Sequence, residues 1–131
     1  MESRQRGVSL TVFACGAIMA LLIVAGLAVD GGAQMSAHVR AQAAAAEVAR
    51  YAVDAAAPYA VDGQDGSGVA LAAAGSAATR FVDLEFGFAI DADGTLKVST
   101  STGVDTTFLQ LIGIRKLTAK GQSTVQLHPP R

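Results

Sequence analysis

The sequence predicts an α+β protein in which one long N-terminal helix crosses a membrane and continues outside it, followed by a small antiparallel β-sheet of about three strands. Three observations predict this architecture. Residues 7–29 form an uncharged apolar run, residues 33–57 contain neither Gly nor Pro, and apolar and polar residues alternate in segments after residue 80. The chain therefore divides into a membrane span, a helical stem and a head.

Composition limits the classes of function. The chain has 131 residues, of which 51% are hydrophobic, 5% are aromatic and 27 are alanines, so few large side chains are available for a core. A net charge of −1 excludes a general electrostatic binder of nucleic acid, which needs a strongly basic face. The single cysteine, Cys15, cannot form an internal disulfide. We accordingly expect no nucleic-acid partner.

The apolar run at 7–29 is long enough to cross a bilayer. As a helix that rises about 1.5 Å per residue, it measures roughly 35 Å, against a hydrocarbon core of about 30 Å. Arg4 and Arg6 precede the run, and basic residues stay on the cytoplasmic side during insertion. We therefore expect residues 1–6 to form a cytoplasmic head and the chain from Asp30 onward to lie outside.

Small residues in the span predict a contact with another helix. Gly16 and Ala20 form a small-xxx-small pair, through which two membrane helices can approach closely. Gly7, Gly26 and Asp30 complete the set of residues that we assign to membrane anchoring and helix contact. These five residues are the candidate site of the chain.

A cleaved signal peptide is the competing interpretation of the span. Gly26 and Ala28 are small residues at the positions that precede a cut after Ala28, which would release a soluble protein beginning at Val29. The apolar stretch of about 18 residues before that site is longer than the usual 7 to 15 of a signal-peptide core. This length favours an uncleaved, single-pass anchor.

The stem, residues 30–60, is predicted to continue the helix outside the membrane. Its Ala, Gln, Glu, Arg and Met residues favour helix, with a soft joint expected at Gly31 and Gly32 and an end near Pro58. An apolar stripe with the helical period suits close packing on another helix or on a small sheet. We expect this stripe to consist of Met35, Val39, Ala46 and Val53.

The small α+β head, residues 61–131, is predicted to begin with two short elements. Glycines and aspartates at 61–68 indicate an exposed loop, and the Ala-rich residues 69–80 indicate a short helix. The sheet is expected over 81–127. Its first strand, at 81–90, alternates with a period of two and carries three of the five phenylalanines, so we place the core of the head there.

The remaining strands follow from turn residues and from alternation. An Asp- and Gly-containing turn at 91–94 joins the first strand to an alternating segment at 95–102, which predicts a β-hairpin. Residues 117–127 alternate again, as in a third strand. His128 belongs to a predicted terminal tail.

A short amphipathic helical turn is predicted between the second and third strands, at residues 105–112. Asp105 or Thr106 is expected to cap its N-terminus, and Gly113 is expected to end it. The apolar side chains of this segment are those of Phe108, Leu109, Leu111 and Ile112.

The sequence contains no motif that carries catalytic or cofactor chemistry. His38 has no ligand-type residue three or four positions away and is expected as a solvated helix residue, and Asp83 and Glu85 are expected as a solvated pair on one strand. The acidic turns at 61–68 and 91–94 lack the spacing of a calcium loop. We expect a non-enzymatic protein with no catalytic residue, metal, cofactor or small-molecule substrate.

The order of these segments resembles a known family. Arg6-Gly7 opens the apolar run, LAVDGG at 27–32 closes it, and an Ala-rich stretch follows at 41–57, as at the N-terminus of the TadE/TadG-like proteins of tight-adherence (Flp) pilus assembly. Residues 98–125 are similar to the ending of short actinobacterial members. The resemblance implies a pilin-like arrangement of an anchoring helix and an exterior α+β head.

The resemblance also implies a role and a location. Pseudopilins of this system that are cleaved by prepilin peptidase carry Glu five residues after the cleavage-site Gly; counted from Gly7, that position is Val12, which favours an uncleaved, TadG-like chain. We expect a minor pseudopilin-like or accessory subunit in the cytoplasmic (inner) membrane. Its expected partners are the membrane and other pilus-assembly subunits, contacted through the helical stem.

Two alternatives stay open. One is a secreted or membrane-anchored binding protein, released by signal-peptide cleavage after Ala28. The other is a membrane-bound accessory or regulatory protein unrelated to pili.

Overall fold

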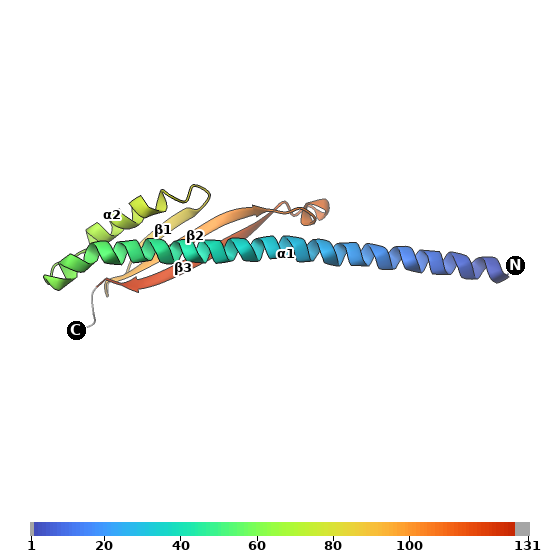
Figure 1. Ribbon diagram of the computed structural model, residues 1–131, viewed down its shortest axis with the longest axis horizontal. Helices are drawn as coiled ribbons and strands as arrows, with labels where there is room; N and C mark the ends of the chain where they lie inside the picture. Colours follow the sequence, from blue (N-terminus) through green and yellow to red (C-terminus); the bar gives the residue numbers. More distant parts are fainter. Residues whose placement is uncertain (1, 128–131) are drawn as a thin grey trace.

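Helix α1 (Glu2–Val61) extends through 60 residues and forms the long axis of the molecule (Figure 1). The structure is a computed structural model that describes residues 2–127, with side chains from residue 7 onward, so that His128 lies outside the described residues. It confirms the predicted fold class: one long apolar N-terminal helix is followed by a small three-stranded antiparallel sheet.

Helix α1 is continuous through the expected soft joint and ends close to the expected stop. The helix continues through Gly31 and Gly32, because a glycine weakens a helix by up to about 1 kcal/mol but does not end it. Pro58 lies inside α1, which ends three residues later at Val61, and the Asp62 N–H still donates to the Pro58 carbonyl at 3.2 Å. The span and the stem are therefore parts of one continuous helix.

The head consists of a short helix, three strands and a 3₁₀ turn. Helix α2 begins two residues before the predicted start and also ends two residues earlier, and the first strand begins four residues after its predicted start because residues 81–84 form turns. Val82, expected in that strand, is 92% exposed. The elements are α2 (Ser67–Ala78), β1 (Glu85–Ile90), β2 (Thr95–Asp105), η1 (Leu109–Ile112) and β3 (Lys116–Gln126).

Strand β2 is the centre of the sheet, with β1 and β3 antiparallel on either side. In the register, Val98 of β2 lies opposite Phe88 of β1 and Ser123 of β3. One face of the sheet packs against the second half of α1 and against α2 (Figure 1). The other half of α1 projects beyond the head.

The core between α1 and the sheet is built mainly from alanine. The predicted stripe is wrong at two of its positions, since Met35 and Val39 are 65% and 64% exposed. The sheet approaches too closely for large residues: the Thr100 hydroxyl donates to the Ala41 carbonyl at 2.9 Å, and a side chain at Gly121 would meet the helix backbone there. The buried residues of α1 in this region are Ala41, Ala44, Ala45, Val48, Ala49, Ala52 and Ala56.

Three polar side chains of α1, spaced four residues apart, bind the outer edge of β3. Gln42 donates from Nε2 to the Gln122 carbonyl at 2.5 Å and accepts the Gln122 N–H at 3.0 Å. His38, expected as a solvated residue, instead places Nδ1 2.8 Å from the Lys120 carbonyl. These contacts occupy backbone groups that an edge strand otherwise exposes. The pairs are Gln34 with Thr118, His38 with Lys120 and Gln42 with Gln122.

Candidate membrane and helix-contact site

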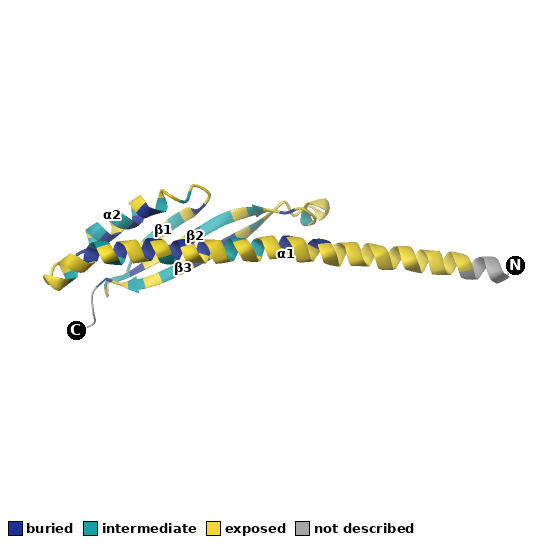
Figure 2. Ribbon diagram, viewed as in Figure 1, coloured by how far each residue is buried: buried dark blue, intermediate teal, exposed yellow. Residues whose placement is uncertain are grey.

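The first half of α1 exposes apolar side chains along almost its whole length. Within residues 7–29, only Gly26 is buried (Figure 2). Within the described residues, α1 is the helix that is long and apolar enough to cross a membrane, and only 6% of its most apolar stretch is buried. A core helix of a soluble protein buries such a surface, so this exposure indicates that residues 7–29 anchor the chain in lipid.

The segment between β2 and β3, residues 106–115, lies beside the end of the span, and we call it the η1 loop. Phe108 of this loop packs against Gly26 of α1: a Cβ placed on Gly26 would lie 2.6 Å from Cγ of Phe108. The missing side chain at Gly26 therefore makes room for the aromatic ring. Gly26, assigned to anchoring and helix contact, has its neighbour in its own chain.

Asp30 joins α1 to the η1 loop through three hydrogen bonds. Its Oδ1 accepts the Thr107 N–H at 2.8 Å, and its Oδ2 accepts the N–H groups of Phe108 and Leu109 at 3.0 and 2.7 Å. The residue is only 2% exposed. Because these donors are at the N-terminal end of η1, where helical N–H groups have no partner of their own, Asp30 caps the turn from another part of the chain.

This arrangement corrects the predicted cap. Asp105 is the last residue of β2, and the Thr106 hydroxyl donates to the Ile114 carbonyl at 2.5 Å, so neither side chain caps η1. The predicted end is confirmed: Gly113 follows η1 with a φ of 94°, a left-handed conformation that favours glycine.

This hydrogen bonding favours the ionised form of the Asp30 carboxyl. Burial of the carboxyl acts to raise its pKa, but the backbone N–H groups of Leu109, Thr107 and Phe108 together outweigh burial, and the pKa is lowered. Asp30 directly follows the last residue of the span. Three backbone N–H groups therefore act on this carboxylate as a basic partner would.

A hydrophobic groove of about 420 Å³ lies between α1 and the η1 loop. Leu111 and Ile112, at the loop end of this groove, are 81% and 72% exposed. Apolar side chains are thus exposed on both elements at the same level of the molecule. The lining residues are Met19, Leu22, Ile23, Leu27, Phe108, Leu109, Leu111 and Ile112.

The structure places the five candidate residues in two groups. Gly26 and Asp30 meet the η1 loop, whereas a Cβ on Gly7 or Gly16 would have no neighbour within 4 Å. Gly16 and Ala20 are exposed, so the helix contact assigned to them stays a prediction.

Sequence reasoning missed the partners of Asp30, because they lie 77 to 79 positions away. One signal could have found them. Phe108 and Leu109 belong to an apolar segment that has neither the period of a strand nor the length of a helix, and such a segment needs a partner surface.

The described residues hold no group of three or more His, Cys, Asp or Glu side chains that could bind a metal ion. Asp83, expected in a solvated pair with Glu85, instead forms an exposed ion pair with Arg40 of α1.

Comparison with protein-family models gives a match over the residues of α1. Residues 7–61 match the family model of putative Flp pilus-assembly TadE/G-like proteins. This range begins at the first residue of the apolar run and ends at the last residue of α1. Comparisons with curated proteins and with solved structures give no match.

Proposed function

We propose that this chain, whose residues 7–61 match the TadE/G-like family model, is a non-enzymatic, single-pass membrane subunit of a Tad/Flp-type pilus assembly or secretion apparatus. Its role in that apparatus is that of a minor pseudopilin-like or accessory subunit. One observation carries the proposal: the matched residues 7–61 comprise both the exposed apolar span and the stem on which the head packs.

The proposed location is the cytoplasmic (inner) membrane, with the N-terminus inside and the head outside. Arg4 and Arg6 support this orientation, because basic residues next to a span stay on the cytoplasmic side. The exposed polar surface of the head then faces the exterior, where other subunits of the apparatus are assembled.

The proposed chain keeps its N-terminal helix. Ala28, the residue before the alternative signal-peptide cut, lies in the middle of α1, whereas sites of proteolysis concentrate in exposed loops. The residues on either side of it, Gly26 and Asp30, both contact the η1 loop. A cut after Ala28 would separate Phe108 from its packing partner.

Subunit contact is proposed through the span and the outer face of the stem. Gly16 and Ala20 are exposed and small, which permits close approach of another helix. The Ala-rich stripe of the stem is covered by the head of the same chain, so the stem offers its opposite face, where Met35 and Val39 are exposed.

A deletion and complementation experiment in the source bacterium tests the proposal. We expect deletion of the gene to abolish pili and adherence, and the wild-type gene to restore them. The double variant Gly16→Leu/Ala20→Leu should reach the membrane at normal level without restoring pili, whereas Ile18→Leu, a substitution at an exposed position on another face of the span, should restore them. Normal pili in the deletion strain would refute the proposed function.

The secreted alternative has a separate test. A C-terminally tagged chain should fractionate with the membrane at its full length, with or without prepilin peptidase. A shorter, soluble form would establish the binding protein that begins at Val29, and a shorter membrane-bound form that depends on the peptidase would establish a processed pseudopilin.

A further inference from the structure

We propose that the η1 loop is a second membrane contact, in which Phe108, Leu111 and Ile112 enter the hydrocarbon of the leaflet on the head's side of the bilayer. The ligand of this surface is lipid: acyl chains around the apolar side chains and headgroup phosphates at the base of the loop. The proposal rests on the anchoring of residues 7–29 and is independent of a role in pili.

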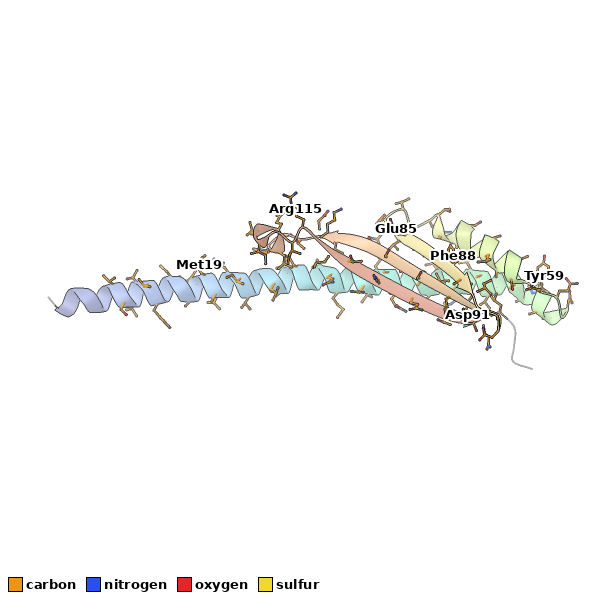
Figure 3. All side chains as sticks on the ribbon, turned by 180° about the vertical axis from the view of Figure 1, so that it is seen from behind. Met19, Tyr59, Glu85, Phe88, Asp91 and Arg115 are labelled. Carbon is orange, nitrogen blue, oxygen red and sulfur yellow. The ribbon has the colours of Figure 1, made fainter. Side chains whose placement is uncertain are left out.

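The level of the loop along α1 is the first argument. Phe108 packs on Gly26, and the shared groove extends to Met19, which is eleven residues before Asp30 and so about 16 Å below it along the helix. Figure 3 shows the loop lying along α1 between the head and Met19. If residues 7–29 lie in the bilayer, the loop beside their second half lies there as well.

Composition is the second argument. Residues 106–114 contain no charged side chain, and charges flank them directly, at Asp105 before the loop and at Arg115 and Lys116 after it. The most exposed apolar residues of the loop are Leu111 and Ile112. An apolar tip between charged ends is the pattern of a segment that enters a membrane interface.

Most backbone N–H groups of the loop are also hydrogen-bonded within the protein. A segment in hydrocarbon must satisfy its N–H groups internally, because no water is available there. Asp30 accepts three of them, and the Thr106 N–H donates to the Arg115 carbonyl at 3.0 Å and closes the base of the loop. Further bonds join Leu111 to Phe108, Gly113 to Gln110 and Ile114 to Leu109.

Basic side chains at the base complete the surface. Arg115 and Lys116 are exposed, and Nζ of Lys116 lies 3.8 Å from Oδ1 of Asp105. Long basic side chains extend toward phosphates at the membrane boundary while their neighbours lie deeper. Lipid is the occupant that the structure favours, because the exposed loop surface is continuous with the surface of the span. A helix of another subunit in the groove is the competing occupant.

Fluorescence of single labelled positions tests the proposal on the full chain. In a Cys15→Ser background, the environment-sensitive dye NBD is attached at Leu111→Cys, and the protein is reconstituted in phosphatidylcholine vesicles with or without doxyl-labelled lipid. Leu10→Cys, exposed in the span, reports anchoring. Val82→Cys, an exposed apolar position on the head, is the matched control in water.

The outcomes distinguish failure of the loop proposal from failure of membrane anchoring by the span. We expect dye at Leu111 to be quenched by doxyl lipid within about twofold of dye at Leu10 and to be protected from aqueous iodide, while dye at Val82 is quenched by iodide. Iodide quenching at Leu111 with lipid quenching at Leu10 overturns the loop proposal alone. Protection of Leu111 from both quenchers also overturns it, in favour of a protein partner. If doxyl lipid does not quench dye at Leu10, the anchoring of residues 7–29 in the membrane is itself wrong.

Discussion

Phe108 donates its backbone N–H to Oδ2 of Asp30 at 3.0 Å, across 78 positions of sequence. This bond and its two neighbours join the η1 loop to the residue at which the span becomes the stem. The same carboxylate therefore holds the end of the head at a fixed level on α1. A single side chain links the membrane segment, the stem and the sheet.

Removal of the Asp30 carboxylate should release the η1 loop. In Asp30→Ala, three N–H groups lose their acceptor, and we expect hydrogen exchange at Thr107, Phe108 and Leu109 to rise by about tenfold or more. Mass spectrometry of the chain in detergent measures this change. Asp54→Ala, at an exposed aspartate of the same helix, should leave the loop unchanged. Equal protection in both variants would contradict the assigned cap.

The lowered pKa of Asp30 predicts how the loop responds to acid. A carboxyl whose pKa is lower in the folded state stabilises that state fully above its ordinary pKa of 3.8, and this stabilisation is lost as the pH falls through the lowered value. We expect the amide resonances of Thr107 and Phe108 to titrate with an inflection below 3.8 in NMR spectra of the micelle-bound chain. Asp30→Asn should abolish that inflection. An inflection above 3.8 would mean that burial prevails over hydrogen bonding.

Gly121 should tolerate no side chain. Its Cβ would collide with the backbone of Ala41 and Gln42, and backbone cannot rotate away, so Gly121→Ala should lower the free energy of unfolding by about 1–3 kcal/mol. Urea unfolding of the full chain in detergent measures the loss. Gly103→Ala on β2 is the matched control, because its nearest neighbour would be the Lys116 side chain at 3.7 Å. If the two variants unfold alike, the close contact of β3 with α1 is wrong.

Loss of the Gln42 side chain should expose the outer edge of β3. Gln42→Ala removes two hydrogen bonds to Gln122, for which we expect a decrease in the free energy of unfolding of about 1–2 kcal/mol and a greater tendency of the chain to associate through the open edge. Urea unfolding and analytical ultracentrifugation check the two effects. Val39→Ala, on the exposed face of the same helix, should show neither.

The long helix and the sheet could be predicted from sequence because their signals are local. The length of the uncharged apolar run predicts the span, and the absence of Gly and Pro from residues 33–57 predicts the helical stem. The alternation of apolar and polar residues predicts the strands. The soft joint expected at Gly31 and Gly32 does not interrupt the helix, because a break depends on neighbouring contacts as well as on the residue. Asp30, immediately before them, is fixed to the head on one side of the helix.

The packing of the stem could not be predicted from periodicity. Met35 and Val39 have the size and spacing of core residues, and both are exposed. The face of α1 that the sheet covers is the one where the two backbones approach closely, at Ala41 and Gly121. Only small residues permit this approach. Likewise, the sequence predicts the cap of η1 at Asp105 or Thr106, which are adjacent to it in sequence, whereas the acceptor is Asp30.

Because α1 is continuous, a movement of the span is transmitted directly to the head. From Asp30 to Val61 the helix is about 47 Å long, and the head is packed along it. A change of about 10° in the tilt of the span within the bilayer would therefore displace the far end of the head by about 8 Å. A neighbouring subunit that changes the tilt of the span moves the distal surface of the head by more than the length of a side chain, without any change in the internal structure of either.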